Sequence, residues 1–116
     1  MTQIPTRIDA VKWAQYFSKL AINEMTWFDF LTVIDRGEGL EVIVRVVNIA
    51  SNESALVSTT VTQEVASLTT TYPGAGWYER EAQEMFGVTF IGLDDGRPLL
   101  HRSHTQGSPM RKSVTL

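Results

Sequence analysis

Apolar side chains recur every three or four residues near the start of the chain. Over residues 8–22 they form one stripe, made of Val11, Ala14, Phe17, Ser18 and Ala21 and widened by Trp13 and Leu20. This spacing predicts a helix over residues 8–22, because positions at this period share one helix face. Thr6 followed by Asp9 is a capping signal that predicts where the helix begins.

Three segments rich in β-branched and aromatic residues follow, separated by short polar turns. The segments cover residues 27–34, 40–49 and 55–61. In the middle segment every second residue is apolar, and Arg45 in the opposite row indicates that the second face is only partly buried. Strands joined by short turns pair antiparallel, so the sequence predicts a three-stranded meander.

The second half of the chain predicts a helical turn, a helix and a strand. Residues 65–68 are interpreted as a short helical turn, followed by a break at residues 72–76. Residues 77–86 are predicted to be helical and to end at Gly87, and residues 88–91 predict a strand. The resulting order is α-β-β-β-α-β. It indicates an α+β fold, with helices packed on a largely antiparallel or mixed sheet.

Charge divides the chain into an acidic body and a basic tail. Of the 116 residues, 10 are Lys or Arg and 13 are Asp or Glu, and every acidic residue precedes position 96. We therefore expect a single α+β domain over residues 1–95 and a basic, extended C-terminal tail over residues 96–116. The tail is either a frayed terminus or an arm that docks on an acidic surface. Its few cations, without interleaved aromatics, do not indicate nucleic-acid binding.

Composition excludes several kinds of site. The chain has no Cys, so it has no disulfide, no thiolate zinc site and no cysteine ligand for an Fe–S cluster. His101 and His104, with Asp94 and Asp95 nearby, leave a weak metal site as an alternative, although zinc would need further ligands. No apolar run approaches the length of a membrane span, and no signal-peptide pattern opens the sequence, so we expect a cytoplasmic protein.

The predicted helix at residues 77–86 carries the densest set of ionisable side chains. Glu81 shares a helix face with apolar residues four positions to either side, so as a carboxylate it needs a partner there. Three interpretations are open. The first is a catalytic pair of Glu79 and Glu81, although residues two apart point to different sides. The second is a solvated face with an Arg80–Glu84 contact, and the third is a buried anchor in which Glu81 and Arg80 reach the tail or a partner.

The run from residue 77 to residue 92 resembles a family signature. It reads W-Y-E-R-E-A-Q-E-M-F-G-V-T-F-I-G and is similar to the motif of the 30-kilodalton subunit family of respiratory complex I. This family, the C subunits of NADH–quinone oxidoreductase, includes the equivalent small subunits of energy-converting NiFe hydrogenases. The matched motif and interface positions are Trp77, Glu79, Arg80, Glu81, Glu84, Phe86, Gly87, Phe90 and Gly92, continued in the tail by Arg97, Pro109, Arg111 and Lys112. Departures at Ser108 and after Gly92 favour a hydrogenase-type or otherwise divergent member.

The resemblance implies a non-catalytic structural subunit in the hydrophilic arm of a complex I-like NADH–quinone oxidoreductase or an energy-converting hydrogenase. Such a subunit docks on the large subunit that holds the quinone site or the NiFe centre, beside a small Fe–S subunit, and supports electron transfer. Fe–S clusters and the quinone or NiFe centre are then expected in partner subunits. No catalytic, cofactor-binding or metal-ligating residue is predicted in this chain. The resemblance also implies a cytoplasmic place at the inner face of the membrane, reached through the complex.

The basic tail has a specific expected role in that assembly. Arg111 and Lys112 are expected to pair with carboxylates of the large subunit, and Pro109 to keep the segment extended. Two other hypotheses remain. One is a free-standing protein-interaction domain derived from the family, and the other is a small hydrolase or metal-dependent enzyme that uses His101 and His104.

Overall fold

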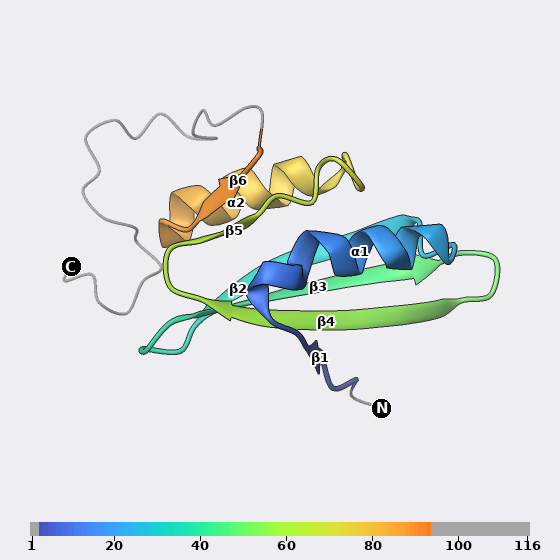
Figure 1. The fold of residues 1–116 in the computed structure, drawn as a ribbon, viewed down its shortest axis with the longest axis horizontal. Coiled ribbons are helices and arrows are strands. Elements are labelled where there is room, and N and C mark those ends of the chain that lie inside the picture. The colour runs from blue at the N-terminus through green and yellow to red at the C-terminus, as the bar shows by residue number, and fades with distance from the viewer. Residues whose placement is uncertain (1–2, 94–116) are drawn as a thin grey trace.

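The computed structural model describes residues 3–93, which form a four-stranded sheet, a two-stranded sheet and two α-helices (Figure 1). The larger sheet has the order β1-β4-β3-β2. Its strands are β1 (Thr6–Arg7), β2 (Trp27–Asp35), β3 (Leu40–Asn48) and β4 (Glu53–Val61). The predicted meander of β2, β3 and β4 is confirmed as antiparallel. The pattern missed β1, which is too short to show periodicity and pairs parallel with β4.

The first helix is confirmed, but it begins later than predicted. A 3-10 helix, η1 (Ala10–Lys12), leads into α1 (Trp13–Ile22). Asp9 starts η1 by accepting a hydrogen bond from the Val11 N–H at 3.3 Å, whereas Thr6 lies in β1 and takes no part in the cap.

The buried stripe of α1 differs from the predicted one. Val11 is 85% exposed, while Trp13 and Phe17 are fully buried and meet edge to face at 4.8 Å between ring centroids. The three-residue turn of η1 breaks the 3.6-residue period before α1 begins, so the face extrapolated from Val11 is displaced. The two large rings bury the most apolar area and set the rotation of the helix.

A β-bulge explains why the β2 sequence alternates only partly. The pairing with β3 shifts between Phe28 and Phe30, which leaves Asp29 as the extra residue. Because of this insertion, Phe28 and Leu31 both face the helices although they lie three positions apart. Asp29 accepts a hydrogen bond from Arg45 Nη1 at 2.5 Å, which fixes the bulge against β3.

The predicted helical turn at residues 65–68 is wrong. Residues Glu64–Ala66 form strand β5, which pairs parallel with β6 (Thr89–Ile91), and α2 (Ala75–Phe86) connects the two strands. Three residues carry too little periodicity to separate a strand from a helical turn. The pairing that decides between them comes from residues far along the chain: the Thr89 N–H donates to the Gln63 carbonyl at 2.7 Å, and the Ser67 N–H donates to the Ile91 carbonyl at 2.8 Å.

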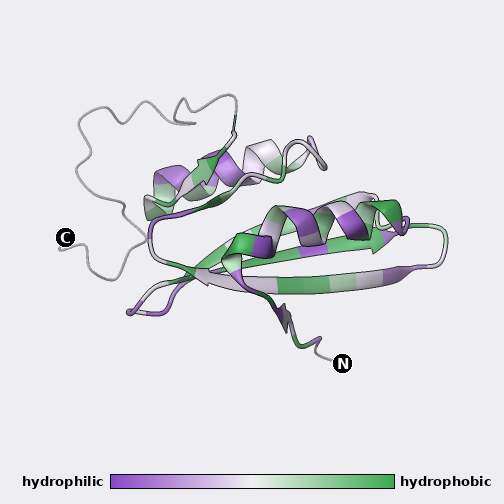
Figure 2. Cartoon of the chain, in the orientation of Figure 1, coloured by the Kyte–Doolittle hydropathy of each residue, from purple (hydrophilic) through white to green (hydrophobic). Residues whose placement is uncertain are grey.

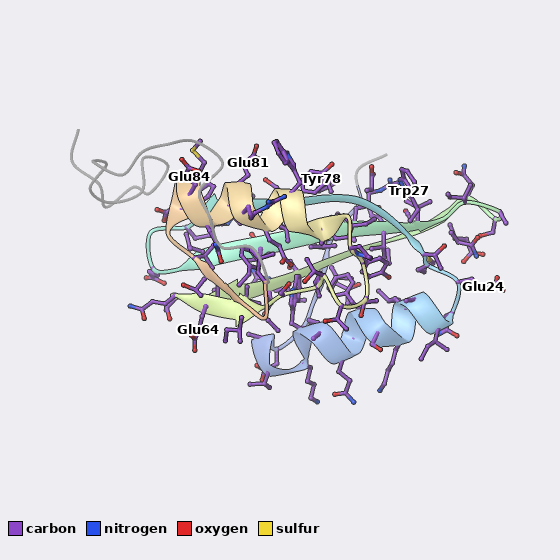
Figure 3. The ribbon with its side chains drawn as sticks, turned by 90° about the horizontal axis from the view of Figure 1, so that it is seen from above. Glu24, Trp27, Glu64, Tyr78, Glu81 and Glu84 are labelled. Atoms are coloured by element: carbon purple, nitrogen blue, oxygen red, sulfur yellow. The ribbon has the colours of Figure 1, made fainter. Side chains whose placement is uncertain are left out.

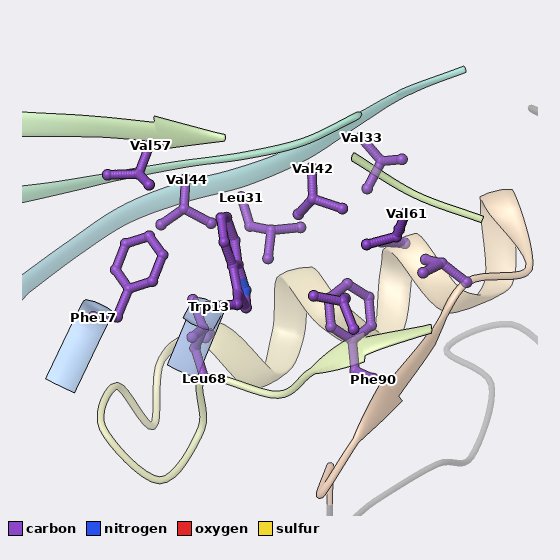
Figure 4. Packing of buried hydrophobic residues seen from close by; sticks show 14 of the residues in the cluster. Trp13, Phe17, Leu31, Val33, Val42, Val44, Val57, Val61, Leu68 and Phe90 are labelled. Atoms are coloured by element: carbon purple, nitrogen blue, oxygen red, sulfur yellow. The ribbon is translucent and has the colours of Figure 1, made fainter. Parts of the chain in front are cut away.

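The hydrophobic core lies between one face of the larger sheet and the layer made by α1, α2 and the β5–β6 pair (Figures 1 and 4). Val42, Val44 and Val46 of β3 are fully buried on this face, as alternation predicted. Trp13 and Phe17 contribute from α1, and Figure 2 shows hydrophobic and hydrophilic residues alternating along that helix. The mixed α+β architecture predicted from the sequence is therefore confirmed.

The opposite side of the larger sheet has no helix on it within residues 3–93 (Figure 1). We call this side the open face. Cross-strand register assigns it these strand residues: Trp27, Phe30, Thr32, Ile34, Glu41, Ile43, Arg45, Val47, Ser54, Leu56, Ser58 and Thr60. Arg45 is half-buried there, as expected for a face that is only partly covered.

Candidate functional site

The family motif falls on one supersecondary unit, the helix α2 and the strand β6 that follows it. α2 begins after the Pro73–Gly74 turn and ends at Gly87, which has φ 74° and donates its N–H to the Gln83 carbonyl at 3.0 Å. A left-handed residue at this position favours glycine because glycine lacks a Cβ. The predicted helix and its C-terminal signal are confirmed, although the helix starts two residues earlier, at Ala75.

The rotation of α2 differs from the one expected for a buried Glu81. Glu79 is fully buried together with Ala75 and Ala82, whereas Glu81 is exposed. Glu81 is therefore not buried within residues 3–93, and the predicted contact of Glu81 and Arg80 with the tail or a partner lies outside the described residues. The anchor is Glu79, because the row containing Glu79 and Ala82 is buried and the row containing Trp77 and Glu81 is exposed.

Glu79 ties α2 to the segment that leaves β5. Its Oε1 accepts a hydrogen bond from the Ser67 hydroxyl at 2.6 Å, and its Oε2 accepts one from the Leu68 N–H at 2.7 Å. The Thr69 N–H donates in turn to the Ser67 oxygen at 3.1 Å. Burial raises the pKa of Glu79, and the hydrogen bonds from Ser67 and Leu68 oppose that rise.

The remaining inward motif residues join α2 to β6. Phe90 is buried, and its N–H donates to Gln83 Oε1 at 2.9 Å. Phe86 is half-buried and packs against the core. Gly92 ends β6 with φ 96°, a conformation that side-chain-bearing residues rarely adopt. Gln83 is a structural residue that sequence reasoning missed, since its amide becomes informative only once β6 lies beside α2.

Tyr78 attaches α2 to the edge of β2. Its hydroxyl donates to the Asp29 carbonyl at 3.2 Å, and its ring lies 5.6 Å from that of Phe28. A groove runs between α2 and β2 and is lined by Leu31, Thr32, Val33, Tyr78, Glu81, Ala82, Met85 and Phe86. The groove is largely apolar, with the exposed Glu81 as its charged member.

The outward side of α2 presents the other motif residues. Trp77 is 57% exposed, Glu81 is exposed, and Arg80, Glu84 and Met85 are half-buried. Figure 3 shows Glu81 projecting from the edge of α2 that faces away from α1. Arg80 Nε donates to the Gly76 carbonyl at 3.4 Å, one turn earlier in the helix. Glu79 and Glu81 point to different sides of the helix, so the structure does not bring them together as a carboxylate pair.

The motif thus divides into residues that build the fold and residues that the fold leaves at its surface. Trp77 illustrates the second class, because exposing more than half of an indole is costly unless another molecule covers it. The tail residues Arg97, Pro109, Arg111 and Lys112 lie outside the described residues, as do His101 and His104.

Residues 3–93 offer neither a clustered metal site nor a membrane-spanning helix. No group of three or more His, Cys, Asp or Glu side chains in this range is placed to hold a metal ion. No helix in the same range combines the length and the apolar character needed to cross a bilayer.

Comparison with known sequences identifies relatives of this chain. The profile of the family "Respiratory-chain NADH dehydrogenase, 30 Kd subunit" matches residues 6–116. The C subunit of NADH-quinone oxidoreductase from Novosphingobium aromaticivorans is 40% identical over 83 residues, which cover 70% of this chain and 27% of that protein. The corresponding protein of Rhodopseudomonas palustris is 33% identical over 98% of this chain and 60% of that protein. The chain therefore spans less than two-thirds of the length of these relatives.

Comparison with solved structures agrees at the level of the fold. A trypsin-resistant fragment of Nqo5 superposes with a TM-score of 0.72 at 16% identity, covering 77% of this chain and 79% of that one. A chain of the membrane-bound sulfane sulfur reductase, an archaeal respiratory membrane complex, superposes with a TM-score of 0.62 at 23% identity, covering 79% of this chain and 60% of that one. With its motif, its fold and a profile match over nearly its whole length, the chain belongs to the family of the 30 Kd subunit of respiratory-chain NADH dehydrogenase.

Proposed function

We propose that this chain is a non-catalytic structural subunit of the hydrophilic arm of a complex I-like NADH–quinone oxidoreductase or an energy-converting hydrogenase. In this role it docks on the large subunit that holds the quinone site or the NiFe centre and lies beside a small Fe–S subunit. Fe–S clusters and the quinone or NiFe centre belong to those partners, and this chain supports electron transfer by holding them in place. The assembly sits at the cytoplasmic, inner face of the cell membrane.

The observation that carries the proposal is the division of the motif on α2. Glu79 and Gln83 are used inside the fold, yet Trp77 and Glu81 of the same motif make no contribution to the core. Partly exposed Trp, flanked by charged side chains, is the composition typical of residues that anchor protein–protein interfaces. The chain also has no Cys with which to hold an Fe–S cluster, which fits a supporting role.

The basic tail supplies a second contact in this proposal. Arg111 and Lys112 pair with carboxylates of the large subunit, and Pro109 keeps the segment from forming a helix. The alternative function is a free-standing interaction domain derived from the family. In that case the outward side of α2 binds a partner unrelated to electron transfer.

Affinity purification of the tagged full chain from its native cell, in mild detergent, tests the proposal. We expect mass spectrometry to find a large subunit of the quinone-reductase or hydrogenase type together with an Fe–S subunit, and nickel analysis to distinguish the two complexes. Recovery of the chain without either subunit would contradict the proposal and favour the free-standing domain.

Three variants locate the contact. Trp77→Ala and the double variant Arg111→Glu/Lys112→Glu are each expected to lower recovery of the large subunit by about tenfold, as for a central interface residue. Val11→Ala is the matched control, because Val11 is 85% exposed on η1, outside the motif. Unchanged recovery with both test variants would show that α2 and the tail are not the docking surface.

A further inference from the structure

The open face of the larger sheet is more apolar than a solvated sheet face requires. Its centre is formed by Phe30, Ile34, Ile43 and Leu56, which are half-buried on three neighbouring strands. Trp27 lies at one end of the patch and is 54% exposed. The exposed side of an antiparallel sheet normally alternates to polar residues, so this patch indicates a surface that another element covers.

The open face carries more Arg than acidic side chains, whereas the full chain carries more acidic than basic residues. Arg7, Arg36 and Arg45 project from it, whereas the acidic strand residues that share it are Asp29 and Glu41. The full chain carries more acidic than basic residues, and α2 in particular has more Glu than Arg. The open face is therefore a basic region on an otherwise acidic body.

The two carboxylates on this face do not neutralise it. Glu41 is buried and accepts hydrogen bonds from Arg36 Nε at 3.0 Å and Arg36 Nη2 at 2.6 Å. Asp29 pairs with Arg45. Arg7 Nη2 lies 3.8 Å from the other oxygen of the same Glu41 carboxylate, and the Arg7 side chain is 72% exposed. Three guanidinium groups thus share two carboxylates, and one positive charge remains for a group from outside.

The shape of the patch matches a helix. Neighbouring strands lie about 4.8 Å apart, so a patch over β2, β3 and β4 is about 10 Å wide. An α-helix with its side chains is about 10–12 Å in diameter. On the other face of the same sheet, α1 already demonstrates how a helix covers these strands (Figure 1).

We propose that the open face binds an amphipathic helix of another protein chain, whose apolar side covers Ile43 and Leu56 and whose carboxylate pairs with Arg7. A second copy of this chain is disfavoured as the occupant, because two identical faces would bring their excess arginines together. This surface lies on the side of the sheet opposite to α2, so the inference goes beyond the proposed function and does not depend on what α2 binds.

Site-specific photocrosslinking in the native cell tests this proposal with the full chain. The photoreactive residue p-benzoyl-phenylalanine replaces Ile43 or Leu56 on the open face, Ser18 on the exposed side of α1 as the control, and Trp77 on α2 to follow the proposed function. We expect positions 43 and 56 to crosslink to one contiguous peptide of a different chain, containing apolar residues and Asp or Glu, well above the yield at position 18.

Two charge-removing variants test whether a carboxylate of the partner pairs with Arg7. In the Ile43 crosslinker background, Arg7→Gln is expected to lower the yield by up to about fivefold, the upper range for an exposed ion pair. Lys12→Gln removes an equal charge from η1 and is expected to leave the yield unchanged. An equal effect of the two variants would overturn the assignment of an acidic partner.

Two other crosslinking results would contradict the proposal. Crosslinks from positions 43 and 56 to this same chain would identify its own tail or a second copy as the occupant, and either would overturn the proposal. Yields no higher than that of position 18 would show that the face is uncovered in the cell. Because position 77 reports on α2 in the same experiment, failure at the open face and failure of the proposed function give different patterns.

Discussion

Glu79 provides the sharpest test of how this fold is held together. Its carboxylate is fully buried and joins α2 to the segment after β5 through the Ser67 hydroxyl and the Leu68 N–H. Replacing Glu79 by Ala removes both acceptors at once. The Leu68 N–H then has no acceptor from this side chain, in a position that bulk water does not reach.

The size of the effect follows from two contributions. A buried donor left without an acceptor costs about 1–3 kcal/mol. The cavity left by a truncated side chain adds about 2 kcal/mol, at the low end of the range for core truncations, because burying the carboxyl group was itself unfavourable. We therefore expect Glu79→Ala to lower the free energy of unfolding by roughly 3–5 kcal/mol, a large part of the about 5–15 kcal/mol available to a domain.

Urea unfolding of the full chain, followed by circular dichroism, measures this loss. With a urea dependence of about 2 kcal/mol per molar, the midpoint is expected to fall by roughly 2 M. Glu79→Gln is the matched control. Its amide oxygen accepts from the Leu68 N–H and its NH2 donates to the Ser67 oxygen, so we expect a loss below about 1 kcal/mol.

The unfolding free energies of Glu79→Ala and Glu79→Gln together test whether the two acceptor oxygens of Glu79 fix α2. A loss below about 1 kcal/mol for Glu79→Ala would show that the hydrogen bonds to Ser67 and Leu68 are not what fixes α2. An equally large loss for Glu79→Gln would show that the negative charge, rather than the pair of acceptors, is required.

Three further results are expected. Burial raises the pKa of Glu79, so the contribution of Glu79 to the free energy of unfolding is fully present below pH 4.5 and is lost as pH rises through the folded-state pKa. The stability of wild type relative to Glu79→Gln, measured from urea midpoints, should therefore fall with rising pH. A difference that does not change with pH would contradict this. The hydrogen bonds from Arg36 hold the pKa of Glu41 below its ordinary 4.5, so the stability of wild type relative to Glu41→Gln should fall as pH drops through the folded-state pKa, measured in the same way. Gly87→Ala should lower thermal stability by about 1–2 kcal/mol because φ is 74°, whereas Gly74→Ala, at φ −64° with open space where the new Cβ would lie, should not. Equal melting temperatures of the two variants would refute the expected loss for Gly87→Ala.

The fold could be predicted where the burial and conformation of a residue depend on its neighbours in sequence. The alternation at Val42, Val44 and Val46 was enough to place β3 in the core, and Gly87 marked the end of α2. The pairing of β5 with β6 could not be predicted in this way. Its three residues acquire their strand conformation from partners that lie beyond α2.

The candidate site could be predicted in its residues but not in its orientation. α2 carries apolar side chains on several sides, including Trp77, Tyr78 and Met85, so its sequence fits more than one rotation. The rotation is selected by contacts that the local spacing does not contain: the Leu68 N–H that meets Glu79, and the Asp29 carbonyl that meets the Tyr78 hydroxyl. Glu79, two positions from the expected Glu81, is therefore the buried anchor.

The arrangement of β5, α2 and β6 has a consequence for how the protein opens. Glu79 binds the end of β5 to α2, and Gln83 binds α2 to β6, so side-chain hydrogen bonds link these three elements into one unit, which the Tyr78 hydroxyl joins to β2. Native proteins exchange their amide hydrogens in contiguous units of this kind. Slow-exchanging amides of β5, α2 and β6 should then become accessible together, and any ligand held by the outer side of α2 will protect all three elements from exchange, including amides that it never touches.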